Sequence, residues 1–142
     1  MTNRILVIVF FAVLFTFFAC SEAEQKLEVY SPEAFAFNIG TEWELNASAQ
    51  VKGFTQVEDE KEYSTKLSYY VNLITPSNET LEEIDYGMIN RTSPEKLMDT
   101  QLEIQIVFDS TFAMGDYTLQ IFVMDDLSDQ QDSTQVKFTL AD

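Results

Sequence analysis

From Lys26 onward, apolar and polar residues alternate with a period of two, which is typical of strands that bury one face. The longest clean alternation covers residues 43–51. Similar, shorter runs predict further strands at 27–29, 35–39, 67–73, 81–88, 102–108, 117–123 and 136–140. This pattern of seven or eight short strands, with no convincing long helix, predicts an all-β domain built as an antiparallel sandwich or barrel.

The alternation also predicts which side chains face the interior. Pro32 interrupts the first strand, after which Phe35, Phe37 and Ile39 share one face. Gly53 shifts the phase of the pattern, as a β-bulge would. The core is expected to be formed by the aromatic and aliphatic residues of the alternations, in particular Trp43, Leu45, Val71, Phe108, Tyr117, Leu119 and Phe138.

Three segments fit the strand pattern less well. The acidic run 58–62 is expected to form a solvated loop. Residues 81–88 are interpreted as an edge strand, with a short helix capped by Asn78 as the alternative. Residues 91–100 are expected to form a crossover loop that has room for one helical turn.

The last two predicted strands carry a resemblance to a known class. Gly115 to Asp125, followed by a loop and then Val136 to Leu140, resembles the final hairpin of immunoglobulin-like and fibronectin type III-like bacterial modules. The resemblance implies one antiparallel immunoglobulin-like sandwich over residues 26–142. It also implies a tyrosine corner, in which the Tyr117 hydroxyl bonds back to the main chain. The paired cysteines of antibody domains are absent, which excludes an antibody-type domain.

The extreme N-terminus has a different character. Arg4 is followed by an uncharged run from Ile5 to Phe18 that is apolar except for Thr16. As a helix these residues would span about 21 Å, which is short of the roughly 30 Å hydrocarbon core of a bilayer. The run therefore fits the hydrophobic region of a signal peptide better than it fits a membrane-spanning helix.

The residues that end this run, Phe17-Phe18-Ala19-Cys20, resemble the lipobox of bacterial lipoproteins. The resemblance implies that residues 1–19 are a signal peptide, that Cys20 is lipidated, and that residues 20–25 tether the domain to a membrane. Ser21, rather than aspartate, follows the cysteine, which by the same resemblance favours the outer membrane. Phe17 departs from the usual aliphatic residue at its position.

Ordinary cleavage after Ala23 is the alternative, and it would release a soluble protein without cysteine. Cys20 is the only cysteine in the chain, so it has no intramolecular disulfide partner. An unpaired thiol in an exported chain favours lipidation over simple cleavage.

The charge of the chain limits its partners. Residues 1–19 contain one positive charge and no negative ones, so the remaining chain has 7 Lys and Arg against 24 Asp and Glu, a net charge of −17. Such a charge discourages binding to phosphate backbones and anionic headgroups. Nucleic acid is therefore excluded as a partner. The domain is expected to be a monomer that contacts the membrane only through its lipid.

The composition offers little for catalysis. The absence of histidine removes the common nucleophile triads and imidazole metal sites, and no cofactor is expected. Asp125, Asp126, Asp129 and Asp132 lie within eight residues, at a predicted hairpin loop. Their spacing is not that of an EF-hand. They are interpreted as a solvated loop, and secondarily as an interaction loop, together with residues 109–114.

Together these features predict a cell-envelope lipoprotein that is not an enzyme and acts as a binding or structural module for an envelope protein or glycan. Two alternatives remain. One is a lipocalin-like barrel that carries a small ligand in an apolar cavity. The other is a secreted soluble protein.

Overall fold

The computed structural model describes residues 25–142; the leader, both predicted cleavage sites and Cys20 lie outside them. The described chain forms eight strands and no helix. They are β1 (Glu28–Asn38), β2 (Trp43–Lys52), β3 (Val57–Asp59), β4 (Glu62–Ile74), β5 (Thr80–Ser93), β6 (Asp99–Phe108), β7 (Gly115–Asp125) and β8 (Gln131–Leu140). Within residues 25–142 there is accordingly no helix that could cross a membrane.

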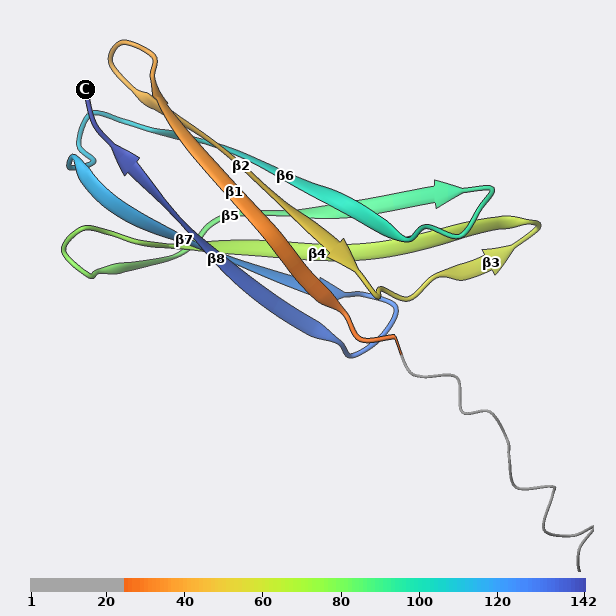
Figure 1. Ribbon diagram of the computed structural model, residues 1–142. Coiled ribbons are helices and arrows are strands. Elements are labelled where there is room, and N and C mark those ends of the chain that lie inside the picture. The colour runs from red at the N-terminus through yellow and green to blue at the C-terminus, as the bar shows by residue number, and fades with distance from the viewer. Residues whose placement is uncertain (1–24) are drawn as a thin grey trace, which may run out of the picture.

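The strands form two layers that cross at an angle (Figure 1). Sheet A has the order β1-β2-β6. In sheet B, β4 pairs along one edge with β5. Along its other edge, the beginning of β4 pairs with β3 and the rest of it pairs with β7. The strand β8 pairs with the free edge of β7. Every ladder is antiparallel. The all-β, antiparallel prediction is therefore confirmed.

The core lies between the two sheets, and all seven side chains predicted to form it are buried. At one end of the core, the Phe138 ring lies 5.4 Å from that of Tyr117 and 6.2 Å from that of Phe108, both measured between centroids. The Tyr117 hydroxyl donates a 2.6 Å hydrogen bond to the Ala113 carbonyl, four residues upstream. The hydrogen bond implied by the resemblance to a tyrosine corner is thus present.

The first strand exists as predicted, and Phe35 and Phe37 share a face as predicted, but that face is the outer one. Between Tyr30 and Glu33, β1 has one residue more than β2, and Ser31 has a φ of +48°. This bulge exchanges the inward and outward positions, because side chains in a strand alternate between the two faces. As a result Ala34 packs against the core, while Phe35 is 60% exposed and points outward.

Two other segments also differ from expectation. Residues 58–62 form the tight β3–β4 hairpin, in which Glu60 and Lys61 both have positive φ, as a two-residue type I′ turn requires. The expected loop at 91–100 is shorter, because β5 continues to Ser93, and it contains no helical turn.

Residues 81–88 belong to β5, which lies at the edge of sheet B as predicted, so the helical alternative is wrong. A register shift opposite Val71 and Leu73 marks a bulge in β5, where Glu83 has a φ of +49° and its N–H donates to the Asn72 side chain. The Tyr69 ring packs so closely over Gly87 that a Cβ there would lie 2.8 Å from it.

The pKa of the Tyr69 hydroxyl is raised above its ordinary value of 10.0, mainly by burial and secondly by the nearby Asp85 carboxylate. The folded state therefore favours the neutral phenol of Tyr69. Its contribution to the free energy of unfolding is complete below pH 10 and is lost as the pH rises through the folded-state pKa. We expect the free energy of unfolding to fall less steeply in Tyr69→Phe than in the wild type above about pH 10. Urea titrations on both sides of that pH would measure it, and identical slopes in the two proteins would contradict the prediction.

Candidate functional site

The four aspartates proposed as an interaction loop lie at one end of the domain, and three of them bind other parts of the chain. Asp125 is only 2% exposed, and its carboxylate accepts hydrogen bonds from the N–H groups of Thr55 (2.7 Å) and Leu127 (3.0 Å). Asp132 accepts a 2.8 Å bond from the Val29 N–H.

Asp126 accepts a 2.8 Å bond from the Ser68 hydroxyl, whereas Asp129 is exposed. Among residues 25–142, no three carboxylates or other metal-binding side chains are grouped to hold a metal ion. These carboxylates thus point to separate places, where they accept hydrogen bonds from β1, from β4 and from the segment after β2.

This loop also lies beside the point where the chain arrives from residues 1–24 (Figure 1). The Gln130 side chain accepts a bond from the Leu27 N–H (2.8 Å) and donates one to the Gln25 carbonyl (3.1 Å). We call this the proximal end. At the opposite, distal end, the Asn38 side chain donates to the Asp142 carboxylate at 3.2 Å, which places the C-terminus beside the β1–β2 turn.

The other predicted interaction loop, 109–114, lies at the distal end and borders a shallow groove of about 480 Å³. The opposite wall is the β4–β5 turn with Pro76. Phe112 contributes an apolar side chain, and its ring packs 4.8 Å from that of Phe108. Hydrogen bonds from Thr111 lower the pKa of Asp109 below its usual range.

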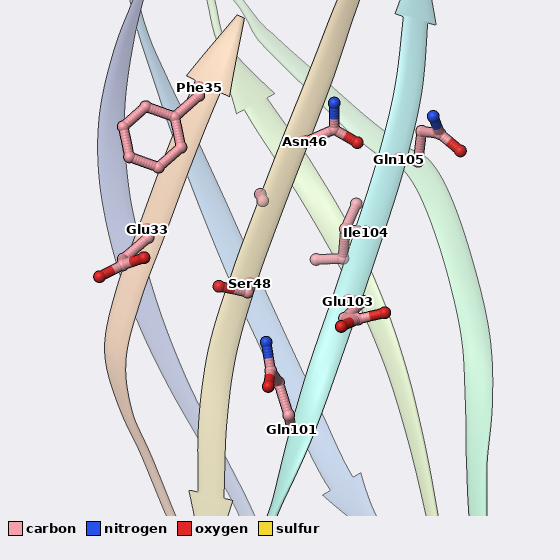
Figure 2. A pocket seen from close by; sticks show the side chains of 9 residues that line it. Glu33, Phe35, Asn46, Ser48, Gln101, Glu103, Ile104 and Gln105 are labelled. Atoms are coloured by element: carbon pink, nitrogen blue, oxygen red, sulfur yellow. The ribbon is translucent and has the colours of Figure 1, made fainter.

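A second groove, of about 540 Å³, runs over the outer face of sheet A, which is the face turned away from sheet B. Three strands line it, and Figure 2 shows their side chains in rows across the sheet. One row places Phe35 of β1, Asn46 of β2 and Gln105 of β6 side by side. The remaining polar lining consists of Glu33 on β1, Ser48 on β2, and Gln101 and Glu103 on β6.

Within residues 25–142, the side chains of Glu33, Ser48, Gln101 and Glu103 are given no hydrogen-bond partner by the fold. Asn46, by contrast, donates a 2.8 Å bond to Glu44. Hydrogen bonds from Asn46 and then Gln105 lower the pKa of Glu44, which lies next to the groove. The groove therefore presents amides, carboxylates and a hydroxyl with free hydrogen-bonding capacity, beside one exposed aromatic ring.

Sequence reasoning did not identify this face, because its polar residues look like the solvated side of ordinary strands. One signal was available. Pro32 within a strand pattern is a sign of a bulge, and a bulge reverses the direction of the residues after it. That reversal would have placed Phe35 outside, next to the polar positions of the second strand.

No protein-family model matches the chain, and no curated protein matches it. The chain is similar to several solved structures, among them two with TM-scores below 0.5. One is a family 123 glycoside hydrolase from Clostridium perfringens, with a TM-score of 0.46 and 12% identity over 69% of this chain and 21% of that one. The other is Northeast Structural Genomics Consortium target SoR45, with a TM-score of 0.47 and 10% identity over 81% of this chain and 87% of that one. This chain spans about a fifth of the hydrolase, and neither likeness bears on activity.

Proposed function

We propose that this protein is a lipid-anchored, non-catalytic binding module of a bacterial cell envelope, attached to the outer membrane through Cys20. The observation that supports a binding role is the outer face of sheet A, where free polar side chains surround an exposed aromatic ring in a groove. The anchor is supported by Cys20 itself, the only cysteine, which directly follows the apolar leader.

We also propose that the domain belongs to the immunoglobulin-like sandwich class. In the strand names of that class, β1, β2 and β6 correspond to A, B and E, which gives one sheet the order A-B-E. In the other sheet, β4, β7 and β8 correspond to C, F and G and have the order C-F-G, with β5 added beside C. The Tyr117 hydrogen bond is a second feature of that class. The lipocalin alternative is disfavoured, because up-and-down barrels pair consecutive strands in one ring, whereas here β2 pairs with β6.

Two carboxyl groups beside the grooves, those of Glu44 and Asp109, are poorly suited to act as general acids. A general acid at neutral pH needs a raised pKa. Hydrogen bonds lower the pKa of both Glu44 and Asp109, which favours their charged forms. Neither is therefore suited to donate a proton.

The position of the two ends bears on where a partner would bind. The chain joins the anchor at the proximal end, so the loop 125–132 would lie toward the membrane. The tether of residues 20–25 spans at most about 22 Å when extended, since each residue adds about 3.3–3.6 Å. The outer face of sheet A and the distal groove would then be the more accessible surfaces.

The lipid anchor predicts a clear labelling result. In cells grown with radiolabelled palmitate, the wild-type protein should carry the label and sediment with membranes, and Cys20→Ser should lose both properties. Without its acyl chains the variant has only a weak tendency to bind anionic membranes, because of its net negative charge. Ser21→Ala, a neighbouring substitution that keeps the thiol, should behave like the wild type. Equal labelling and partition of wild type and Cys20→Ser would refute the anchor and favour the secreted alternative.

A further inference from the structure

The bulge in β1 presents large apolar side chains to solvent at a conformational cost. Phe35 and Phe37 are 60% and 54% exposed, while the small Ala34 and Ala36 occupy the inward positions. Without the extra residue, the phenylalanines would face the core, where burying each would be favourable. Ser31 adopts a left-handed φ of +48°, which costs about 1 kcal/mol or more for a residue other than glycine. Bulges of this kind commonly re-aim side chains next to binding sites.

The side chains around Phe35 have a definite arrangement. Beside the row of Phe35, Asn46 and Gln105 lies a second row, in which Glu33 and Glu103 flank Ser48. Gln101 extends the polar surface toward the proximal end of β6, four residues from Gln105. At about 3.4 Å per residue, this gives a polar surface about 14 Å long, carried on rigid strands.

We propose that this outer face of sheet A binds a neutral oligosaccharide, with Phe35 packing against the apolar face of one sugar ring. Gln101 offers both donors and acceptors, and Asn46 and Gln105, which each donate one bond to Glu44, keep a second N–H and the carbonyl oxygen. Glutamate accepts from hydroxyl groups. Sugar hydroxyls likewise both donate and accept, and the C–H face of a pyranose ring is apolar. The combination of amides, carboxylates and one aromatic ring matches these groups. The inference rests on the proposed binding role and names its ligand class.

A basic peptide is the main competing ligand for an acidic domain, and the geometry disfavours it here. Glu33 and Glu103 lie on β1 and β6, with β2 between them. Neighbouring strands lie about 4.8 Å apart, so the two carboxylates are too far apart to bind a single ammonium group together. Ammonium and guanidinium groups only donate hydrogen bonds, so these side chains would pair with the carboxylates of the groove but not with its amide N–H groups.

The test is calorimetric titration of the full-length, exported protein in a detergent without a sugar headgroup. The probes are cellohexaose, chitohexaose, maltohexaose and mannohexaose, with poly-L-lysine as the basic competitor. At least one hexasaccharide should bind saturably, and its Kd should change little with salt, because no charge is neutralised. Phe35→Ala and, separately, Gln105→Ala should each raise that Kd at least tenfold.

Tyr86→Ala is the matched control, because Tyr86 is also an exposed aromatic on the outer face of a sheet, 77% exposed, but on sheet B. It should leave the Kd within twofold of the wild type. All three side chains are exposed, so unchanged thermal unfolding would show that the variants are folded.

The inference is overturned if none of the four sugars binds, if Phe35→Ala and Tyr86→Ala have equal effects, or if only poly-L-lysine binds in a salt-dependent way. Each of these outcomes leaves the palmitate result untouched, so failure of the ligand assignment is distinguishable from failure of the lipid anchor.

Discussion

Replacing Asp125 by alanine should cost about 3–6 kcal/mol of unfolding free energy, because a hydrogen bond to a charged group contributes about 1.5–3 kcal/mol and Asp125 accepts two. The substitution would leave the N–H groups of Thr55 and Leu127 without their acceptor in a partly buried region. It would also release the segment after β2 from the end of β7. Urea unfolding, followed by the fluorescence of Trp43, measures the effect.

Asp129→Ala is the matched control from the same loop. Asp129 is exposed, and substitutions at such positions usually change stability by no more than about 0.5 kcal/mol. Both variants remove one negative charge, so the difference between them isolates the hydrogen bonds. If the two variants were equally stable, Asp125 would not have the structural role described here.

Replacing Gly53 by alanine should cost about 2–4 kcal/mol. Gly53 has a φ of +73°, and the left-handed conformation alone costs a residue with a Cβ about 1–2 kcal/mol. An added Cβ would also lie 2.0 Å from the Lys26 carbonyl oxygen, so the main chain itself would have to move. The displaced segments hold Leu27 and Phe54, which are both buried. Thermal unfolding should show a clearly lower Tm.

Gly40→Ala separates the two contributions. Gly40 also has a positive φ, +111°, but a Cβ there would meet nothing within 4 Å. It should therefore show the conformational cost without the steric one. A Gly53→Ala variant no less stable than Gly40→Ala would contradict the close contact between residues 26 and 53.

Most of the strands and most of the core could be predicted from the sequence, because apolar and polar residues alternate with a period of two along a half-buried strand. The clean alternation of 43–51 corresponds closely to β2, and Trp43 and Leu45 are buried as expected. Gly53 marked a real change of phase, since Val51 and Phe54 are both buried. Tyr117 was correctly placed by the resemblance of the last hairpin to known modules.

The direction of β1 after its bulge could not be predicted from periodicity alone, because periodicity reports which residues share a face but not which face is buried. Phe35 and Phe37 look like core residues by hydrophobicity alone. The extra residue near Pro32 decides the outcome, and its effect appears only in the register with β2. The β3–β4 hairpin was missed for a related reason, since Glu60 and Lys61 adopt left-handed angles without the usual glycine or asparagine.

The groove on sheet A could not be predicted, because it is formed by strands far apart in the sequence. Asn46 and Gln105 become neighbours only through the pairing of β2 with β6, and three strands of the other sheet, β3 to β5, lie between these two in the chain. The four aspartates of 125–132 show the opposite case. They are close in sequence, yet the fold directs Asp125 and Asp132 to different segments.

The most direct test of the account is the intact mass of the protein isolated from envelopes of the organism that produces it. A lipid-anchored module predicts a chain that begins at Cys20 and carries the added mass of acyl chains on that residue. An unmodified chain beginning at Glu24 would contradict the anchor and, with it, the proposed position of the domain at the membrane.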